Sequence, residues 1–132
     1  MNEVRGVGYI AEWNKTTHIN LVDLNKHSDY LGTIKLKKKL PRIQGAKYYD
    51  HSLIASVDDD KNTVYQISLI DGSVEKLFSL NEGDEMEGIA VRPMPDGSLI
   101  HVIQLYGKAS DPASGYHEEL HHYARIVTRP CG

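Results

Sequence analysis

Residues 44–80 read QGAKYYDHSLIASVDDDKNTVYQISLIDGSVEKLFSL, and this stretch decides the fold. Four segments rich in β-branched and aromatic residues are separated by short polar links, and none of them keeps a helical period. The links consist of Asp, Asn, Lys, His and Gly, most of which favour tight turns. The pattern predicts four consecutive strands, at residues 44–49, 52–57, 63–69 and 73–80.

The link Asp71-Gly72 is the strongest turn signal in this stretch. It stands between two alternating segments and predicts a hairpin, with Gly72 at positive φ. In the segment before it, Tyr65, Ile67 and Leu69 alternate with polar residues, as in a strand with one apolar face. The stretch therefore predicts a four-stranded antiparallel meander.

The same unit recurs along the chain at offsets of 43 to 46 residues. The aligned segments are 10–11 with 54–55, 19–24 with 64–69, 30–36 with 74–80, 43–45 with 86–88, and 52–54 with 98–100. A steady period of this length is typical of propeller blades and other repeat architectures. We expect an all-β protein of about three blade-like units, at roughly residues 1–41, 42–83 and 84–132, in a single propeller-like domain.

The two outer units are incomplete. The first offers strands near residues 8–13, 17–24 and 30–37, and lacks the innermost strand. The third offers strands near 88–92, 98–106 and 120–128, with an insertion at 107–119, and lacks the outermost strand. Three blades would leave two apolar flanks and open sheet edges.

A homodimer would cover both flanks, because two such chains make six blades. We expect its interface to involve Trp13 or Tyr30 on one side and Ile126 on the other, and to bury more than about 1,000 Å². Two alternatives remain open: the chain is part of a larger propeller, or it curls into a barrel-like sheet.

Composition narrows the function classes. Fifteen basic and 18 acidic side chains give a formal charge of −3, which argues against nucleic acid or a membrane surface as the partner. The first twenty residues contain no apolar segment typical of a signal peptide, and no apolar run has the length of a membrane span. Cys131 is the only cysteine, so no internal disulfide forms. A cytoplasmic protein is the expectation.

Two motifs resemble blade motifs of six-bladed propeller families. They are EMEGIAV at 85–91, followed by PDGSL at 95–99, and the hairpin VDDDKNTVYQI at 57–67. The chain resembles, over about residues 8–107, the gluconolactonase-like, NHL-repeat and SdiA-regulated groups and the esterase-like domain of some phytases. In the gluconolactonase-like enzymes a Glu-Gly pair near an innermost strand helps to hold a divalent metal. The resemblance implies that role for Glu87, although the second unit has Gln44 at the matching position.

Histidines and glutamates gather at residues 117–122. His117 and His121 would share a face on a helical turn, and His117, Glu119 and His121 would share one on a strand. Imidazoles bind transition metals, so His117 and His121 are candidate metal ligands together with Glu87. The other interpretation is an exposed, polar start to the last strand.

Two charged runs have simple explanations. The three consecutive aspartates at 58–60 lack the alternating spacing of a calcium loop and fit a solvated hairpin tip. The basic run at 35–42 is typical of an edge strand guarded against further pairing.

No sequence motif for nucleophilic catalysis or for phosphate binding occurs. The leading hypothesis is a non-catalytic module that needs no cofactor and binds a protein or small molecule through its loops. Tyr116 and His117, in the insertion at 107–119, are the expected binding residues. The alternative is a metal-dependent hydrolase of the lactonase or phosphoesterase type.

The alternation of apolar residues also predicts the core. Its expected members are Leu53, Ile54, Val57, Val64, Ile67, Leu69, Val74, Leu77, Phe78, Ile89, Val91, Leu99, Val102 and Ile103.

Overall fold

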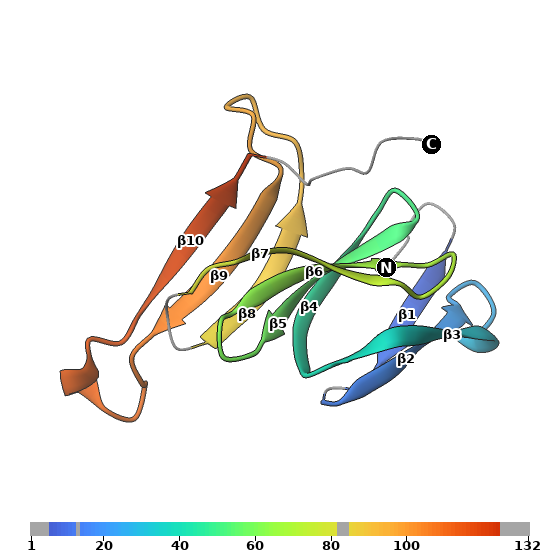
Figure 1. Cartoon of the computed structure of the whole chain (residues 1–132), viewed down its shortest axis with the longest axis horizontal. Coiled ribbons are helices and arrows are strands. Elements are labelled where there is room, and N and C mark those ends of the chain that lie inside the picture. Colours follow the sequence, from blue (N-terminus) through green and yellow to red (C-terminus); the bar gives the residue numbers. More distant parts are fainter. Residues whose placement is uncertain (1–5, 13, 82–84, 125–132) are drawn as a thin grey trace.

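The computed structural model describes residues 6–12, 14–81 and 85–124, and these form three antiparallel sheets in chain order (Figure 1). The first sheet consists of β1 (Val7–Ala11), β2 (Thr16–Asp23) and β3 (Asp29–Leu40). The second consists of β4 (Arg42–Tyr49), β5 (Ser52–Asp58), β6 (Thr63–Ser68) and β7 (Val74–Ser79). The third consists of β8 (Glu85–Val91), β9 (Ile100–Tyr106) and β10 (His117–Tyr123). Each sheet is a simple meander, since strands adjacent in sequence are neighbours in space.

The structure confirms an all-β chain with three meander units, of which the outer two are incomplete. The four strands of the middle unit begin and end within two residues of the expected positions. Within the described residues no helix has the length and apolar character needed to cross a bilayer. Trp13 and Ile126, which we expected at an interface, lie outside the described residues, and Tyr30 is 66% exposed.

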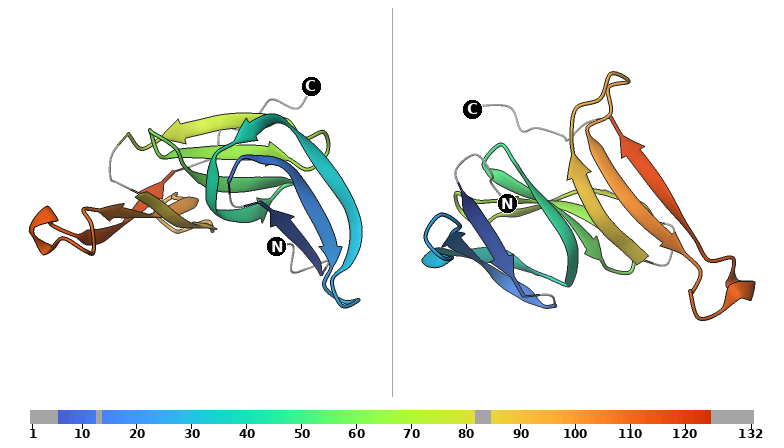
Figure 2. Two further views of the ribbon diagram at one scale, coloured as in Figure 1. Left: turned by 90° about the horizontal axis from the view of Figure 1, so that it is seen from below. Right: turned by 180° about the vertical axis from the view of Figure 1, so that it is seen from behind.

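The middle sheet is covered on both faces, so the molecule has two cores (Figure 2). The core between the first and second sheets contains Ile19, Leu36 and Leu40 packed against Leu53, Ala55, Val57, Tyr65 and Ile67. The core between the second and third sheets contains Ile54 and Val64 packed against Met86, Ile89, Ile100 and Val102. Because β5 contributes alternate residues to both cores, the whole of it is buried.

The second and third sheets meet most closely at two glycines on their innermost strands. Both strands carry a β-bulge there, between Ile43 and Gly45 in β4 and between Met86 and Ile89 in β8. A Cβ placed on Gly45 would lie 3.3 Å from the Cα of Gly88 and 3.2 Å from the nitrogen of Ile89. The predicted repeat of Gly45 and Gly88 thus corresponds to a close approach of two backbones.

The buried hydroxyl of Ser56 joins the two bulges. Its oxygen lies 2.7 Å from the carbonyl oxygen of Glu87 and 3.3 Å from that of Gly45, so it donates to β8 and contacts β4. Ser56 has no exposed surface, and a buried carbonyl that loses its donor is destabilising.

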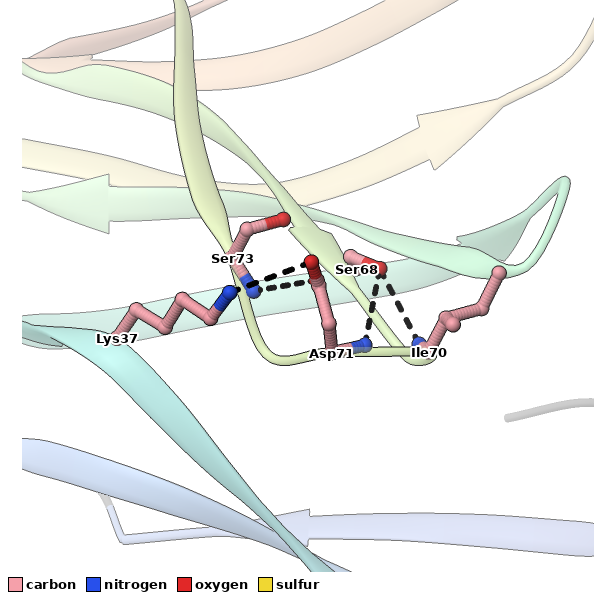
Figure 3. Close-up of polar contacts among 5 residues, drawn as sticks. All are labelled: Lys37, Ser68, Ile70, Asp71 and Ser73. Carbon is pink, nitrogen blue, oxygen red and sulfur yellow. Dashed lines mark hydrogen bonds and ion pairs between the residues drawn. The ribbon is translucent and has the colours of Figure 1, made fainter.

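The hairpin between β6 and β7 fastens the second sheet to the first (Figure 3). Gly72 has φ +76°, as predicted, and its carbonyl accepts a hydrogen bond of 2.9 Å from the backbone nitrogen of Lys37. The carboxylate of Asp71 lies 3.4 Å from the Lys37 ammonium and accepts from the Ser73 nitrogen at 2.9 Å. The Ser68 hydroxyl accepts from the nitrogens of Ile70 and Asp71, which completes the turn.

The core prediction is wrong for Ile103, which is 39% exposed. If Gly45 is aligned with Gly88, Ile43 corresponds to Met86. Ile43 is paired with Val57 and Met86 is paired with Gln104, so Gln104, and not Ile103, is the counterpart of Val57. Gln104 is fully buried in the position of Val57. Our alignment of β5 with β9 was one residue out of register, and such a slip exchanges the two faces of a strand.

Seven of the predicted core residues are buried: Leu53, Ile54, Val57, Val64, Ile67, Ile89 and Val102. The other six are partly buried and pack against one of the two cores: Leu69, Val74, Leu77, Phe78, Val91 and Leu99.

Candidate functional site

The hairpin formed by β9 and β10 extends away from the stacked sheets (Figure 1). Its connection contains a bridge between Lys108 and Asp111 and a 3₁₀ turn at Pro112–Ser114. The Ser114 hydroxyl accepts from the Lys108 nitrogen at 2.8 Å and lies 2.6 Å from the Asp111 carbonyl oxygen. Gly115 follows in the left-handed region at φ +74°, where glycine is favoured. The connection is therefore held by its own hydrogen bonds.

The last strand begins earlier than predicted. β10 starts at His117, directly opposite Tyr106, instead of at residue 120, so the loop ends at Tyr116. The sequence suggested a loop to residue 119 because the segment is polar and carries no apolar alternation. Its first four residues are all exposed, which agrees with the interpretation of a polar start to the strand.

His117 is held in one orientation although its surroundings are open to solvent. Its Nδ1 lies 2.7 Å from the Gly115 carbonyl oxygen and its Nε2 lies 2.8 Å from a Glu119 carboxylate oxygen. The ring stacks on Tyr106, with centroids 4.8 Å apart and planes at 5°. The backbone acceptor at Gly115, followed by Glu119, raises the pKa of His117 above its ordinary value. Both acceptors favour the protonated ring.

His121 joins the same row of side chains. The second oxygen of Glu119 lies 3.5 Å from His121 Nε2, and the Tyr106 hydroxyl lies 3.2 Å from that nitrogen. The structure thus brings His117, Glu119 and His121 to one face of a strand, which was one of the two arrangements expected. No group of three or more histidine, cysteine, aspartate or glutamate side chains in the described part of the chain is arranged to hold a metal ion.

Tyr116, the other expected binding residue, stands at the end of the loop and is 43% exposed. It directly precedes His117, and its position follows from the left-handed Gly115. An aromatic side chain with this exposure next to a fixed imidazole offers apolar surface and a hydroxyl to a partner.

Glu87 lies on β8, which β9 separates from β10, so it stands apart from the two histidines. Burial raises its pKa, and the neighbouring carboxylates of Glu85, Asp58 and Glu118 raise it further. Gln44, its counterpart in the second unit, donates to Glu85 at 3.0 Å. This region is acidic, but no three described carboxylate or imidazole groups in it are arranged to hold a metal ion.

The charged runs have partners within the fold. Arg42 pairs with Asp58 at 2.7 Å, and the Lys38 ammonium lies 5.1 Å from the centre of the Tyr65 ring. Asp59 accepts from the backbone of Lys61 and from the Thr63 hydroxyl, which shapes the hairpin tip. These contacts give both runs a structural explanation.

Sequence reasoning missed one polar hollow of about 400 Å³ at the turns of the second sheet. Its lining is rich in hydroxyl, amide and carboxylate groups: Asp50, Ser52, Gln66, Ser68, Asp71, Ser73 and Glu75, with Ile70 beside them. The Gln66 amide donates to Ser52 at 3.1 Å. In the sequence, the signal for this hollow was the serines that flank the β4–β5 and β6–β7 turns. Serine is common beside turns, so these residues also have an ordinary explanation.

Comparison of the chain with known family models and with curated proteins found no match. The function proposed below therefore depends on the geometry alone.

Proposed function

We propose that the protein is a non-catalytic binding module that recognises a protein segment through the end of the β9–β10 hairpin. The observation that carries this proposal is the fixed orientation of the exposed His117, directly next to the exposed Tyr116. His117 is stacked on Tyr106 and hydrogen bonded at both ring nitrogens, yet it belongs to neither core. Side chains held in place before binding lose less entropy when a partner arrives.

The chemistry of this surface fits a peptide. Tyr116 supplies an aromatic face and a hydroxyl, and Glu118 and Glu119 add negative charge beside it. A segment with an apolar side chain next to a basic one would complement both features. The packing of the three sheets against one another supports the proposal further, because loops on rigid sheets commonly carry recognition.

A displayed library of random peptides, selected on the native chain, tests this proposal. Selected peptides should lose about tenfold or more of their affinity for Tyr116→Ala and for His117→Ala. His27→Ala serves as the control, because His27 is an exposed residue of the β2–β3 turn. Equal binding to all variants, or a selection that enriches no peptide, would remove the proposal.

The alternative proposal is a metal-dependent hydrolase that uses Glu87. The observation in its favour is the raised pKa of Glu87, which burial causes and the neighbouring carboxylates increase. Thermal unfolding of the native chain and of Glu87→Gln with Ca²⁺, Mn²⁺ or Zn²⁺ decides it. A metal that stabilises the native chain but not the variant supports the hydrolase, and no shift with any of the three rejects it.

A further inference from the structure

The outward faces of the first and third sheets both expose apolar side chains. On the third sheet, Leu120 is 57% exposed and Ile103 is 39% exposed, and the two are paired across β9 and β10. On the first sheet, Ile10 is 52% exposed, whereas Val22 on the same face is buried. Contiguous exposed apolar surface, such as that of Leu120 and Ile103, marks a contact surface.

The outward face of the third sheet corresponds to a face that is buried within the molecule. To compare the two sheets, we align Gly45 of β4 with Gly88 of β8. The residues that follow these glycines are Ala46, which is paired with Ala55 and through it with Tyr65, and Ile89, which is paired with Val102 and through it with His121. The first set of three therefore corresponds to the second. The next pair along, Ser56 with Val64, therefore corresponds to Ile103 with Leu120. Val64 is fully buried because the third sheet packs against it. Leu120 occupies the same position, one sheet further along.

The outward face of the first sheet has the complementary correspondence. Ile19 of the first sheet packs toward the second sheet, and Val64 of the second sheet packs toward the third. Ile19 is paired with Ala11, and Val64 is paired with Ser56, so these two pairs occupy equivalent positions. The next pair, Ile10 with Asn20, then matches Ala55 with Tyr65. Ala55 is buried against the preceding sheet. Ile10 thus stands where a preceding sheet would pack.

The two faces also differ in charge. Beside Leu120, the face of the third sheet carries Glu118 and the paired histidines His101 and His122. The face of the first sheet carries Lys35 and His18, which are paired with each other across β2 and β3. The carboxylate of Glu118 on one face and the ammonium of Lys35 on the other favour contact between unlike faces over contact between like faces.

We propose that the partner of these faces is a second copy of the chain, with the third sheet of one copy stacked on the first sheet of the other. The contact repeats, between molecules, the stacking of the second sheet on the third within one molecule. Because each copy carries one face of each kind, two copies are able to cover both faces of both chains. This assembly does not involve Tyr116 or His117, so it stands or fails independently of the proposed function.

Two variants and their mixture test the assembly in sedimentation experiments over a range of micromolar concentrations. Ile10→Glu damages one face and Leu120→Glu damages the other, and both sites are exposed, so the fold is retained and is checked by circular dichroism. Each variant alone should associate at least about tenfold more weakly than the native chain, because each native contact uses one face of each kind. Ile70→Glu is the matched control, since Ile70 is 81% exposed but lies in the β6–β7 turn, on neither face.

The mixture of the two variants distinguishes unlike-face contact from every other dimer. The intact third sheet of Ile10→Glu should bind the intact first sheet of Leu120→Glu, so mixing should restore a heterodimer. A native chain that stays monomeric at every concentration overturns the proposal. So does an assembly that either variant leaves unchanged, or a mixture that remains monomeric although the native chain associates.

Discussion

The carbonyl oxygen of Gly72, in the turn between β6 and β7 of the second sheet, accepts a hydrogen bond of 2.9 Å from the backbone nitrogen of Lys37 on β3 of the first sheet. The turn approaches β3 so closely that a Cβ added to Gly72 would lie 1.9 Å from the Lys35 carbonyl oxygen. Gly72 therefore serves both its own hairpin and the contact between the first two sheets.

Replacing Gly72 with alanine should lower the free energy of unfolding. The decrease should be clearly larger than the decrease expected from the left-handed backbone conformation alone. The conformational change costs about 1 kcal/mol, and the clash with Lys35 adds to it. Gly97→Ala is the matched control, because Gly97 has φ +89° and nothing within 4 Å of its added Cβ. Urea unfolding of both variants checks this, and equal losses would show that the turn does not touch the first sheet.

Replacing Ile67 with alanine should lower the free energy of unfolding by about 2–5 kcal/mol. Ile67 has no exposed surface and lies in the core between the first and second sheets. Ile70→Ala, three residues further at an 81% exposed position, should change stability by less than about 0.5 kcal/mol. A loss near zero for Ile67→Ala would mean that β6 presents its other face to the core.

The fold was largely predictable because the middle unit combines strict alternation with turns of Asp, Asn and Gly. The strand register of the two outer units was harder to predict. Residues 10–11 and 54–55 are both Ile-Ala, and this identity suggested equivalent positions. The pairings show instead that Ala11 takes the place of Ser56. Short apolar pairs look alike whichever face they present, so pairing across strands is needed to assign them.

The candidate site was predictable only in part. The sequence placed Tyr116 in the connection before the last strand, but it placed His117 there as well and did not reveal that His117 begins β10 opposite Tyr106. That pairing depends on the length of the connection and on its 3₁₀ turn, which determine where the returning strand begins. Gln104 was missed because a fully buried glutamine in the position of Val57 leaves no apolar signal.

The stability of the protein should depend on Glu87 in a pH-dependent manner. Because its pKa in the folded protein is raised above the ordinary 4.5, the charged form opposes folding at neutral pH. Glu87→Gln should therefore raise stability at pH 7, by less than about 1 kcal/mol since the group is only partly buried. The gain should shrink as the pH falls through the raised pKa and vanish below 4.5.

Thermal unfolding of native and Glu87→Gln proteins across this pH range measures the effect. Asp60→Asn removes the same charge from an exposed turn and should show no comparable gain. A variant that is less stable than the native chain at pH 7 would show that Glu87 accepts a favourable contact instead.

His117 should titrate above the ordinary histidine value of 6.5, because Gly115 and Glu119 both favour its protonated form. The protonated ring of His117 therefore stabilises the hairpin. This stabilisation is fully present below pH 6.5 and is lost as the pH rises through the raised pKa of His117. Nuclear magnetic resonance titration of the imidazole measures the midpoint directly. In Glu119→Gln the midpoint should fall toward 6.5, and a midpoint that does not move would show that the carboxylate has no part in holding the ring.

The stacking of the second sheet on the third is the central feature of this fold, and it predicts a specific contact between Gly45 and Gly88. A nuclear Overhauser effect between their α-protons is the most direct measurement, because a Cβ placed on Gly45 would lie 3.3 Å from the Cα of Gly88. The account predicts a strong cross-peak between these residues, comparable with those inside the second sheet. Absence of that cross-peak, while the pairs within β4 and β5 are observed, would contradict the stacking of the second and third sheets.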